Sequence, residues 1–311
     1  MPAMKFSLRQ LEVFVAIGRT DSVSRAAEEL PLSQSATSTA LGELERQFNL
    51  QLFDRVGKSL RLNETGRQLL PHAIELINRA REIEDLLEGR SGFGPLNIGA
   101  TLTVGNYLAT LIVANFLQKY PQSKVRLQVH NTSAIVQKVA NYELDLGLVE
   151  GDCQHPDIEV LPWIEDELVV FSAPEHPLAG APQVSTKQLL GEAWILREEG
   201  SGTRETFERA FGHPATLDIR LELEHTEAIK RAVESGLGIG CISRLALKDA
   251  FRRGSLVPLN TPQLELVRHF YFLWHKQKYQ SAGMREFLAL CKSMTAGVTR
   301  SDEVNIPFIT A

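Results

Sequence analysis

Residues 33–48 of the chain, SQSATSTALGELERQF, read as a helix whose first half carries five hydroxyl groups and no charge. Ser33 is a good N-cap for such a helix, and the apolar residues that follow recur at helical spacing. A shorter helix precedes it, because Ser22 can cap a segment from Val23 to Leu30 that Pro31 ends. Two short helices joined by a tight turn are typical of a helix-turn-helix unit.

A small wing and one long helix are expected after this unit. Residues 52–62 predict a two-stranded wing with Gly57-Lys58 at its tip. Asn63 can then cap a helix that runs to about Leu87. The apolar positions of this helix form a heptad seam, which favours pairing with a second subunit over packing on its own domain. The seam consists of Leu69, Ala73, Leu76, Ala80, Ile83 and Leu87.

The composition of the chain limits the classes of protein to which it can belong. The chain has 311 residues, of which 43% are hydrophobic, and its net charge of −5 means that any nucleic-acid site must be local. Three scattered cysteines, Cys153, Cys241 and Cys291, are too few for a disulfide framework or a zinc site, so we expect neither metal nor cofactor. The N-terminus is unlike a signal peptide, and no run approaches the roughly 20 apolar residues of a membrane span. We therefore expect a soluble cytoplasmic protein without a membrane partner.

The remainder of the chain has a different character. A stretch rich in glycine, serine and proline at residues 88–95 reads as a hinge. Beyond it, strands alternate with helices, which predicts an α/β domain with a mostly parallel sheet. The chain contains no nucleotide P-loop and no G-x-S-x-G motif, and Gly236 to Gly240 lacks the spacing of a dinucleotide fingerprint, so an enzyme is not expected.

Residues Leu8 to Arg55 and Leu62 to Gly66 resemble the LysR-type transcriptional regulators in the order and spacing of their segments, and the resemblance covers essentially the whole chain. It implies a DNA-binding regulator that assembles as a homodimer through its linker helix and further as a homotetramer. It also implies an effector domain of two α/β lobes like those of periplasmic binding proteins. The implied divisions are a winged helix-turn-helix at 1–63, a dimerising linker helix at 64–88, a hinge at 89–95, an effector domain at 96–295 and a C-terminal tail at 296–311. Lobe I covers about 96–165 and 268–295, and lobe II about 166–267.

Two later stretches narrow the resemblance. Residues 196–205, LREEGSGTRE, and 225–244, HTEAIKRAVESGLGIGCISR, look like the cysteine-metabolism branch of the family, the CysL/YeiE-like regulators, some of which respond to sulfite. One departure lies in the recognition helix, where Thr39 and Gly42 stand at positions at which many relatives carry arginine or another long side chain.

The expected DNA contacts combine short hydroxyls with a basic wing. A helix N-terminus binds phosphate readily, and small hydroxyl residues allow close approach. Gln34 can read an adenine through its amide, whereas the basic side chains near the wing supply phosphate affinity. Ordinary capping is the alternative reading of the hydroxyl groups. The expected contacts are Ser24, Arg25, Ser33, Gln34, Ser35, Ser38, Thr39, Arg55, Lys58 and Arg61.

Polar residues also gather where strands of the effector domain end and helices begin, which is where such domains bind ligands. Helix N-termini together with hydroxyls favour an anion, and an arginine would add charge. Each hydroxyl has capping as its alternative role, and a carboxylate at Glu150 repels an anion unless it is protonated or paired. The expected effector residues are Thr101, Thr103, Thr132, Ser133, Glu150, Arg197, Ser201, Gly202, Thr203, His225 and Thr226.

The ligand itself is less narrowly defined than the site. A small oxyanion such as sulfite or sulfate suits hydroxyls and helix N-termini better than an aromatic ligand does, but a carboxylate or aromatic metabolite remains an alternative. A redox switch is a further alternative that needs a reactive cysteine. The acidic neighbour of Cys153 disfavours it, because a nearby negative charge raises the pKa of a thiol.

Overall fold

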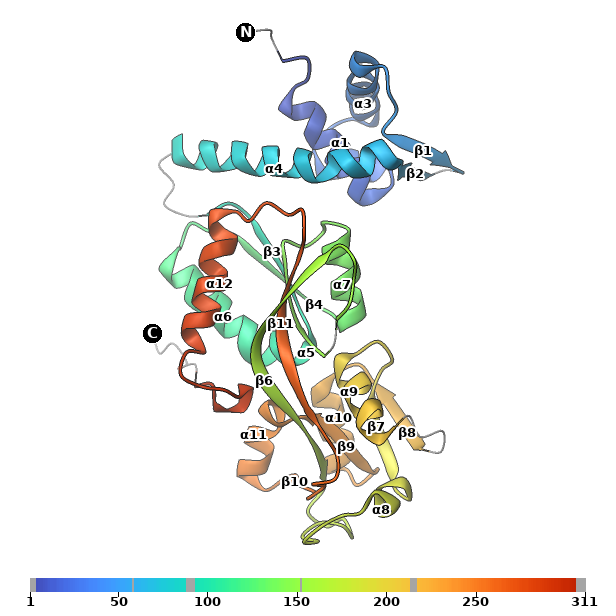
Figure 1. Cartoon of the computed structure of the whole chain (residues 1–311), viewed down its shortest axis with the longest axis vertical. Helices are drawn as coiled ribbons and strands as arrows, with labels where there is room; N and C mark the ends of the chain where they lie inside the picture. The colour runs from blue at the N-terminus through green and yellow to red at the C-terminus, as the bar shows by residue number, and fades with distance from the viewer. Residues whose placement is uncertain (1–3, 58, 88–92, 152, 213–216, 306–311) are drawn as a thin grey trace.

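The computed structural model describes residues 4–57, 59–87, 93–151, 153–212 and 217–305, without the side chains of residues 85 and 86. Figure 1 shows a small helical domain at one end, a long helix lying beneath it, and an elongated α/β domain that extends away from this helix. In these described ranges no helix is long and apolar enough to cross a membrane.

The N-terminal domain is built from α1 (Leu8–Thr20), α2 (Val23–Glu29) and α3 (Gln34–Phe48). The hydroxyls of Ser7, Ser22 and Ser33 each cap the helix that follows. Apolar residues from all three helices and from the start of the wing form one core around Phe14, which is fully buried. Strands β1 (Phe53–Val56) and β2 (Ser59–Leu62) pair antiparallel as the wing.

The long helix α4 (Glu64–Leu87) has two different halves. Its first half packs on α1 through Leu70, Ala73, Ile74 and Ile77, all of which are buried in the core of the N-terminal domain. The second half projects beyond that domain and leaves Ile83 57% exposed. The predicted seam is therefore divided, because Ala73 packs inside its own domain whereas Leu76, Ile83 and Leu87 are exposed.

One continuous sheet runs through the effector domain, in the strand order β4-β3-β5-β11-β6-β9-β7-β8. In lobe I, β3 (Leu96–Ala100), β4 (Val125–Val129) and β5 (Leu146–Glu150) are parallel. In lobe II, β7 (Ala193–Arg197), β8 (Asp218–Leu223) and β9 (Ile239–Ser243) are parallel. Two long antiparallel strands, β6 (Ile158–Ser172) and β11 (Val267–His275), join the lobes, as Figure 1 shows, and the short β10 (Val257–Pro258) pairs with β6.

Helices cover the faces of both halves of this sheet. Lobe I carries α5 (Leu102–Val104), the π-helical turn η1 (Gly105–Ala109), α6 (Thr110–Lys119), α7 (Thr132–Ala140) and α12 (Ala282–Met294). Lobe II carries α8 (Thr186–Leu190), α9 (Gly202–Phe211), α10 (Thr226–Glu234) and α11 (Arg244–Arg253). Each lobe has its own apolar core, with Phe270 and Phe287 buried in lobe I and Trp194 and Phe207 in lobe II.

The chain beyond α12 returns to the junction of the lobes. The Glu165 amide donates to the carbonyl oxygen of Thr299 at 3.1 Å, and a 3-10 turn, η2 (Ser301–Glu303), packs against β6 and α11. Residues 299–303, which we placed in a C-terminal tail, thus lie against the strand that connects the two lobes.

Candidate DNA-binding surface and effector site

The start of α3 presents the expected contact face to solvent. Ser33 accepts a hydrogen bond from the Ala36 amide at 3.1 Å, so it acts as the cap. Thr37 is fully buried and donates to the Ser33 carbonyl oxygen at 3.0 Å, so it belongs to the core side of the helix. The remaining expected residues of this helix are exposed: Gln34, Ser35, Ser38 and Thr39. One face of the helix is therefore polar, uncharged and open.

Basic groups lie on α2 and on the wing, the elements that precede and follow α3 in the chain. Arg55 and Arg61 are exposed on the two strands of the wing and have no acidic partner in the part of the chain that the structure describes. Ser24 and Arg25 are exposed at the start of α2, where the Arg25 guanidinium donates to the Thr20 carbonyl oxygen. Lys58 lies outside the described residues. The structure thus leaves Arg55 and Arg61 exposed, as the expectation of phosphate contacts through the wing requires.

In lobe I, the expected effector residues converge on Glu150, at the end of β5. The hydroxyls of Thr101 and Thr103, which follow β3, donate to its two carboxylate oxygens, the second at 3.2 Å. Thr132, at the start of α7, donates to the Glu150 carbonyl oxygen at 3.1 Å. All four side chains are at least nine-tenths buried. The two hydroxyls that could bind an anion therefore serve the protein's own carboxylate in this structure.

Lobe II meets this cluster through the N-terminus of α9. The Gly202 amide donates to the Thr132 hydroxyl at 3.1 Å, and Ser201 caps the helix. A Cβ atom added to Gly202 would lie 2.0 Å from the Glu150 carbonyl oxygen, and one on Gly151 would lie 2.8 Å from the Gly202 Cα. Only glycine permits so close a contact between backbones. The two lobes are thus in direct contact at this point.

A buried ion pair stands behind α9. Arg268, on β11, donates to the Asp166 carboxylate at 2.8 Å and to the Thr203 hydroxyl at 2.9 Å. The same carboxylate accepts hydrogen bonds from Ser243 at 2.6 Å and from Ser301 at 2.5 Å. Because Arg268 uses the Thr203 oxygen as an acceptor, the Thr203 hydroxyl proton stays available for a ligand. One nitrogen of Arg268, Nη2, is buried without a partner among the described residues.

Sequence reasoning missed this ion pair. Asp166 lies on β6 and Arg268 on β11, while the two serines that donate to Asp166 come from β9 and from the segment after α12. Asp166 and Ser301 are 135 residues apart. Asp166 stands between Glu165 and Glu167 in β6, so no local pattern marks it as the buried member of the three, although buried charges are nearly always paired.

The other expected effector residues make no hydrogen bond to Glu150 or to the Asp166–Arg268 pair in the described structure. Arg197 is held by two hydrogen bonds to Glu198, at 2.7 and 2.9 Å, although its Nη1 lacks a partner within the described chain. Ser133 is exposed and donates to the Gly200 carbonyl oxygen at 3.2 Å. His225 is exposed and makes no side-chain cap, whereas the Thr226 hydroxyl is buried and unpartnered in the described structure.

The three thiols are poor candidates for a redox site. Burial, followed by the negative charge of Glu205, raises the pKa of Cys153 to about 11. Complete burial also raises the pKa of Cys241 and of Cys291. Redox sensors rely on a thiol whose pKa is lowered, so these environments oppose that chemistry. Among the described residues, no group of three or more histidine, cysteine or acidic side chains is placed to hold a metal ion.

Comparison with known proteins defines the class. The family described as "Bacterial regulatory helix-turn-helix protein, lysR family" matches residues 8–67, and "LysR substrate binding domain" matches residues 89–296. The chain therefore belongs to the LysR family: it is a transcriptional regulator with a DNA-binding helix-turn-helix and an effector domain, not an enzyme. The fold class expected from the sequence is confirmed.

Individual relatives span nearly the whole chain. The chain is 44% identical over 289 residues to the protein named "Uncharacterized HTH-type transcriptional regulator YeiE" from Escherichia coli (strain K12), covering 93% of this chain and 98% of that one. A full-length variant of OxyR from Pseudomonas aeruginosa superposes with a TM-score of 0.70 at 21% identity, covering 94% of this chain and 96% of that one, which supports the fold alone. The CcmR regulatory domain from Synechocystis PCC6803, solved in complex with 2-PG, gives a TM-score of 0.61 at 32% identity, covering 66% of this chain and 98% of that domain.

Proposed function

We propose that this regulator senses a small oxyanion of sulfur, sulfite or sulfate, in the cleft between its two lobes. The observation that carries the proposal is the set of buried threonine hydroxyls, Thr101, Thr103, Thr132 and Thr203, gathered where the strand ends of lobe I face the N-terminus of α9. Hydroxyl and amide donors without a large apolar surface suit a small anion. The resemblance of residues 196–205 and 225–244 to the cysteine-metabolism branch of the family supports sulfur chemistry, and the chain is 44% identical to the YeiE protein, whose name states no ligand.

Glu150 determines how such an anion binds. A fully charged anion competes with its carboxylate for the Thr101 and Thr103 hydroxyls and is repelled by it. A protonated oxyanion such as bisulfite carries one negative charge fewer than sulfite and can donate a hydrogen bond to the carboxylate, which offsets part of the repulsion. The arrangement therefore favours sulfite, which carries a proton in part near neutral pH, over sulfate, which does not.

Calorimetric titration of the full-length chain with sulfite, sulfate and thiosulfate tests the assignment. We expect saturable binding of sulfite, weakened about tenfold by Thr101→Val because one hydrogen bond is lost. Thr186→Val is the matched control, since Thr186 opens α8 at the far end of lobe II. Glu150→Gln should reduce the ratio of sulfite affinity to sulfate affinity. Binding of a carboxylate or aromatic metabolite, with no heat from any sulfur oxyanion, would refute the proposed ligand class and leave the regulator assignment intact.

The proposed assembly follows from the exposed half of α4. Leu76, Ile83 and Leu87 are exposed large apolar residues on one helix, at heptad spacing. Pairing with the same helix of a second chain would cover them. We infer a homodimer through this segment and a homotetramer through further contacts, acting on promoter DNA in the cytoplasm. Sedimentation of Ile83→Glu should show a smaller species than the wild type, and an unchanged species would contradict this contact.

A further inference from the structure

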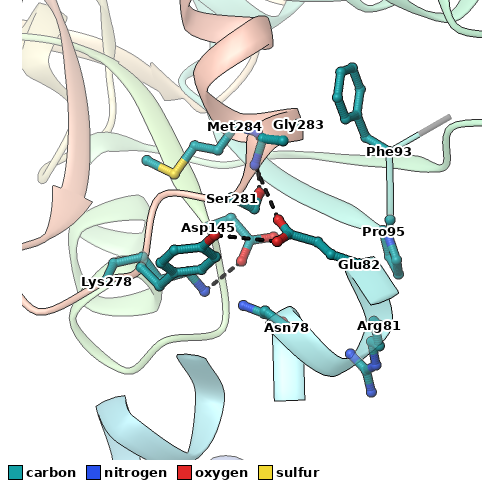
Figure 2. Close-up of a pocket in the computed structure, with 13 residues that line it drawn as sticks. Asn78, Arg81, Glu82, Phe93, Pro95, Asp145, Lys278, Ser281, Gly283 and Met284 are labelled. Atoms are coloured by element: carbon teal, nitrogen blue, oxygen red, sulfur yellow. Dashed lines mark hydrogen bonds and ion pairs between the residues drawn. The ribbon is translucent and has the colours of Figure 1, made fainter. Parts of the chain in front are cut away.

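The second half of α4 touches lobe I at the start of α12 (Figure 2). One carboxylate oxygen of Glu82 accepts a hydrogen bond from the Ala282 amide at 3.2 Å, and the other accepts one from the Tyr279 hydroxyl, also at 3.2 Å. Ala282 is the first residue of α12, so its amide has no partner within the helix. A carboxylate at this positive end of a helix is stabilised by the helix dipole. Glu82 thus completes the N-terminal cap of a helix that belongs to a different domain.

The loop that presents Tyr279 is fixed to lobe I. The Lys278 ammonium pairs with Asp145 at 2.6 Å, and its side chain is only 4% exposed. Asp145 also accepts a hydrogen bond from the Asn97 amide, on β3, at 2.7 Å. On the other side, the Arg79 guanidinium lies 4.6 Å from the centre of the Tyr279 ring. Tyr279 is therefore held between the sheet of lobe I and the linker helix.

A second contact lies nearer the N-terminus of α4. Tyr142, which follows α7 in lobe I, is 8% exposed and belongs to the same apolar cluster as Leu70 and Ile74 of α4. Its φ of 58° is unusual for a residue other than glycine, and strained residues of this kind persist only where the surroundings hold them. Its hydroxyl lies 2.7 Å from Nδ1 of His275, the last residue of β11. Two separate places on lobe I therefore meet two separate turns of the linker helix.

The contact at Glu82 is only partly packed. A cavity of about 300 Å³ lies between the linker helix and lobe I, lined by Asn78, Glu82, Asp145, Lys278, Tyr279 and Met284. Figure 2 shows Glu82 reaching across from α4 to the start of α12. The two hydrogen bonds of Glu82 are long, and its side chain is only half-buried. An interface of this kind opens at low cost, unlike the apolar core around Tyr142.

We propose that lobe I carries a docking surface for the linker helix, and that Glu82 is the residue that closes it. With Glu82 in place, α4 and lobe I form one body, and the DNA-binding domain is attached to it because Arg81 of α4 also pairs with Glu12 of α1 at 3.7 Å. Lobe II lies at the opposite end of the molecule from α4 (Figure 1), so a rearrangement of the cleft moves lobe II against this body. Release of Glu82 frees the linker helix to change its angle to lobe I.

Deuterium uptake in the full-length protein tests the docking directly. Glu82→Ala removes both hydrogen bonds, and Glu84→Ala is the matched control because Glu84 is an exposed residue of the same helix without a partner among the described residues. We expect residues 280–286 to exchange about tenfold faster in Glu82→Ala than in the wild type, as for loss of a hydrogen bond to a charged group. Exchange in α1 and α3 should stay unchanged, which would show that the N-terminal domain remains folded.

Small-angle scattering of the same variants tests the consequence for shape. Glu82→Ala should increase the maximum dimension of the particle, Tyr279→Phe should increase it less, and Glu84→Ala should leave it unchanged. Equal exchange and equal dimensions in Glu82→Ala and the wild type would overturn the proposal. Faster exchange without any change of shape would also overturn it, since Glu82 would then cap α12 without closing the docking surface. Neither measurement depends on the identity of the effector.

Discussion

The proposed DNA-binding surface and the proposed effector site differ in the burial of their polar side chains. On α3, the residues Gln34 to Thr39 that face outward are exposed, and the arginines of the wing have no acidic partner in the described structure. At the junction of the lobes, Thr101 and Thr103 are buried and both donate hydrogen bonds to the buried carboxylate of Glu150. If these are the binding sites, DNA would meet side chains that are largely open to solvent, whereas an effector would have to displace hydrogen bonds that the protein already makes. Affinity at the first surface depends on salt, and affinity at the second on the cost of opening the cluster.

Among the buried polar groups, we expect the largest loss of stability when Asp166 is replaced. Its carboxylate holds Arg268, and both side chains are at most 1% exposed. Asp166→Ala leaves a buried arginine uncompensated, which should lower the free energy of unfolding by about 3–5 kcal/mol. Denaturant unfolding measures this loss. Asp249→Ala is the matched control, because Asp249 pairs with Arg252 at the surface and should cost less than about 1 kcal/mol. Equal losses in both variants would contradict the role of the buried pair.

On the exposed surface, replacement of Gln34 distinguishes base recognition from phosphate binding. Gln34→Ala should reduce binding to the operator by about 1–3 kcal/mol while changing binding to random duplex little, because an amide that reads a base contributes only at the correct sequence. Arg55→Ala is the contrasting variant, since loss of a phosphate contact should weaken both complexes and lower the salt dependence of binding by about 0.9 per contact. Fluorescence anisotropy at several salt concentrations separates the two effects. A Gln34→Ala loss that is equal on both duplexes would exclude base reading by this residue.

The smallest expected effect concerns the thiols, which belong to neither side of the comparison. With its pKa raised to about 11, Cys153 is ionised at pH 7 in only about one molecule in ten thousand, and the thiolate is the reactive form. Iodoacetamide should therefore label Cys153 slowly at pH 7, with a rate that rises about tenfold per pH unit towards the pKa. Mass spectrometry of the native protein follows this labelling, with the denatured protein as a control. Rapid labelling at pH 7, or loss of DNA binding on mild oxidation that Cys153→Ser prevents, would restore the redox alternative.

Local signals made the N-terminal domain predictable. Its three helices α1, α2 and α3 each begin after a serine that caps them, and its core, apart from Tyr142, is formed by residues between Leu11 and Ile77. The strand ends of the effector domain could be predicted in the same way, because Thr101, Thr132 and Ser201 each lie where a helix begins. The bonding between them could not. A hydroxyl at a helix start reads as a cap, and nothing near Thr101 in the sequence indicates that it donates to Glu150, 49 residues away.

The heptad seam shows a second limit of local patterns. Ala73 and Ile83 both belong to the apolar repeat, yet Ala73 is 1% exposed and Ile83 is 57% exposed. The difference arises because the apolar core of the N-terminal domain covers α4 only as far as Ile77. An apolar stripe identifies which face of a helix is buried, but it does not identify the surface that covers it.

The order of the strands in the effector sheet has a consequence for synthesis. Strand β11, which pairs with both β5 and β6, lies at residues 267–275, near the end of the chain, so lobe I does not complete its sheet until almost all of the protein has left the ribosome. Apart from Tyr142, which lobe I contributes, the buried core of the DNA-binding domain lies between Leu11 and Ile77, and domains fold as units during synthesis. A nascent or prematurely terminated chain of about a hundred residues would therefore already carry the part that holds DNA and none of the part that responds to a signal.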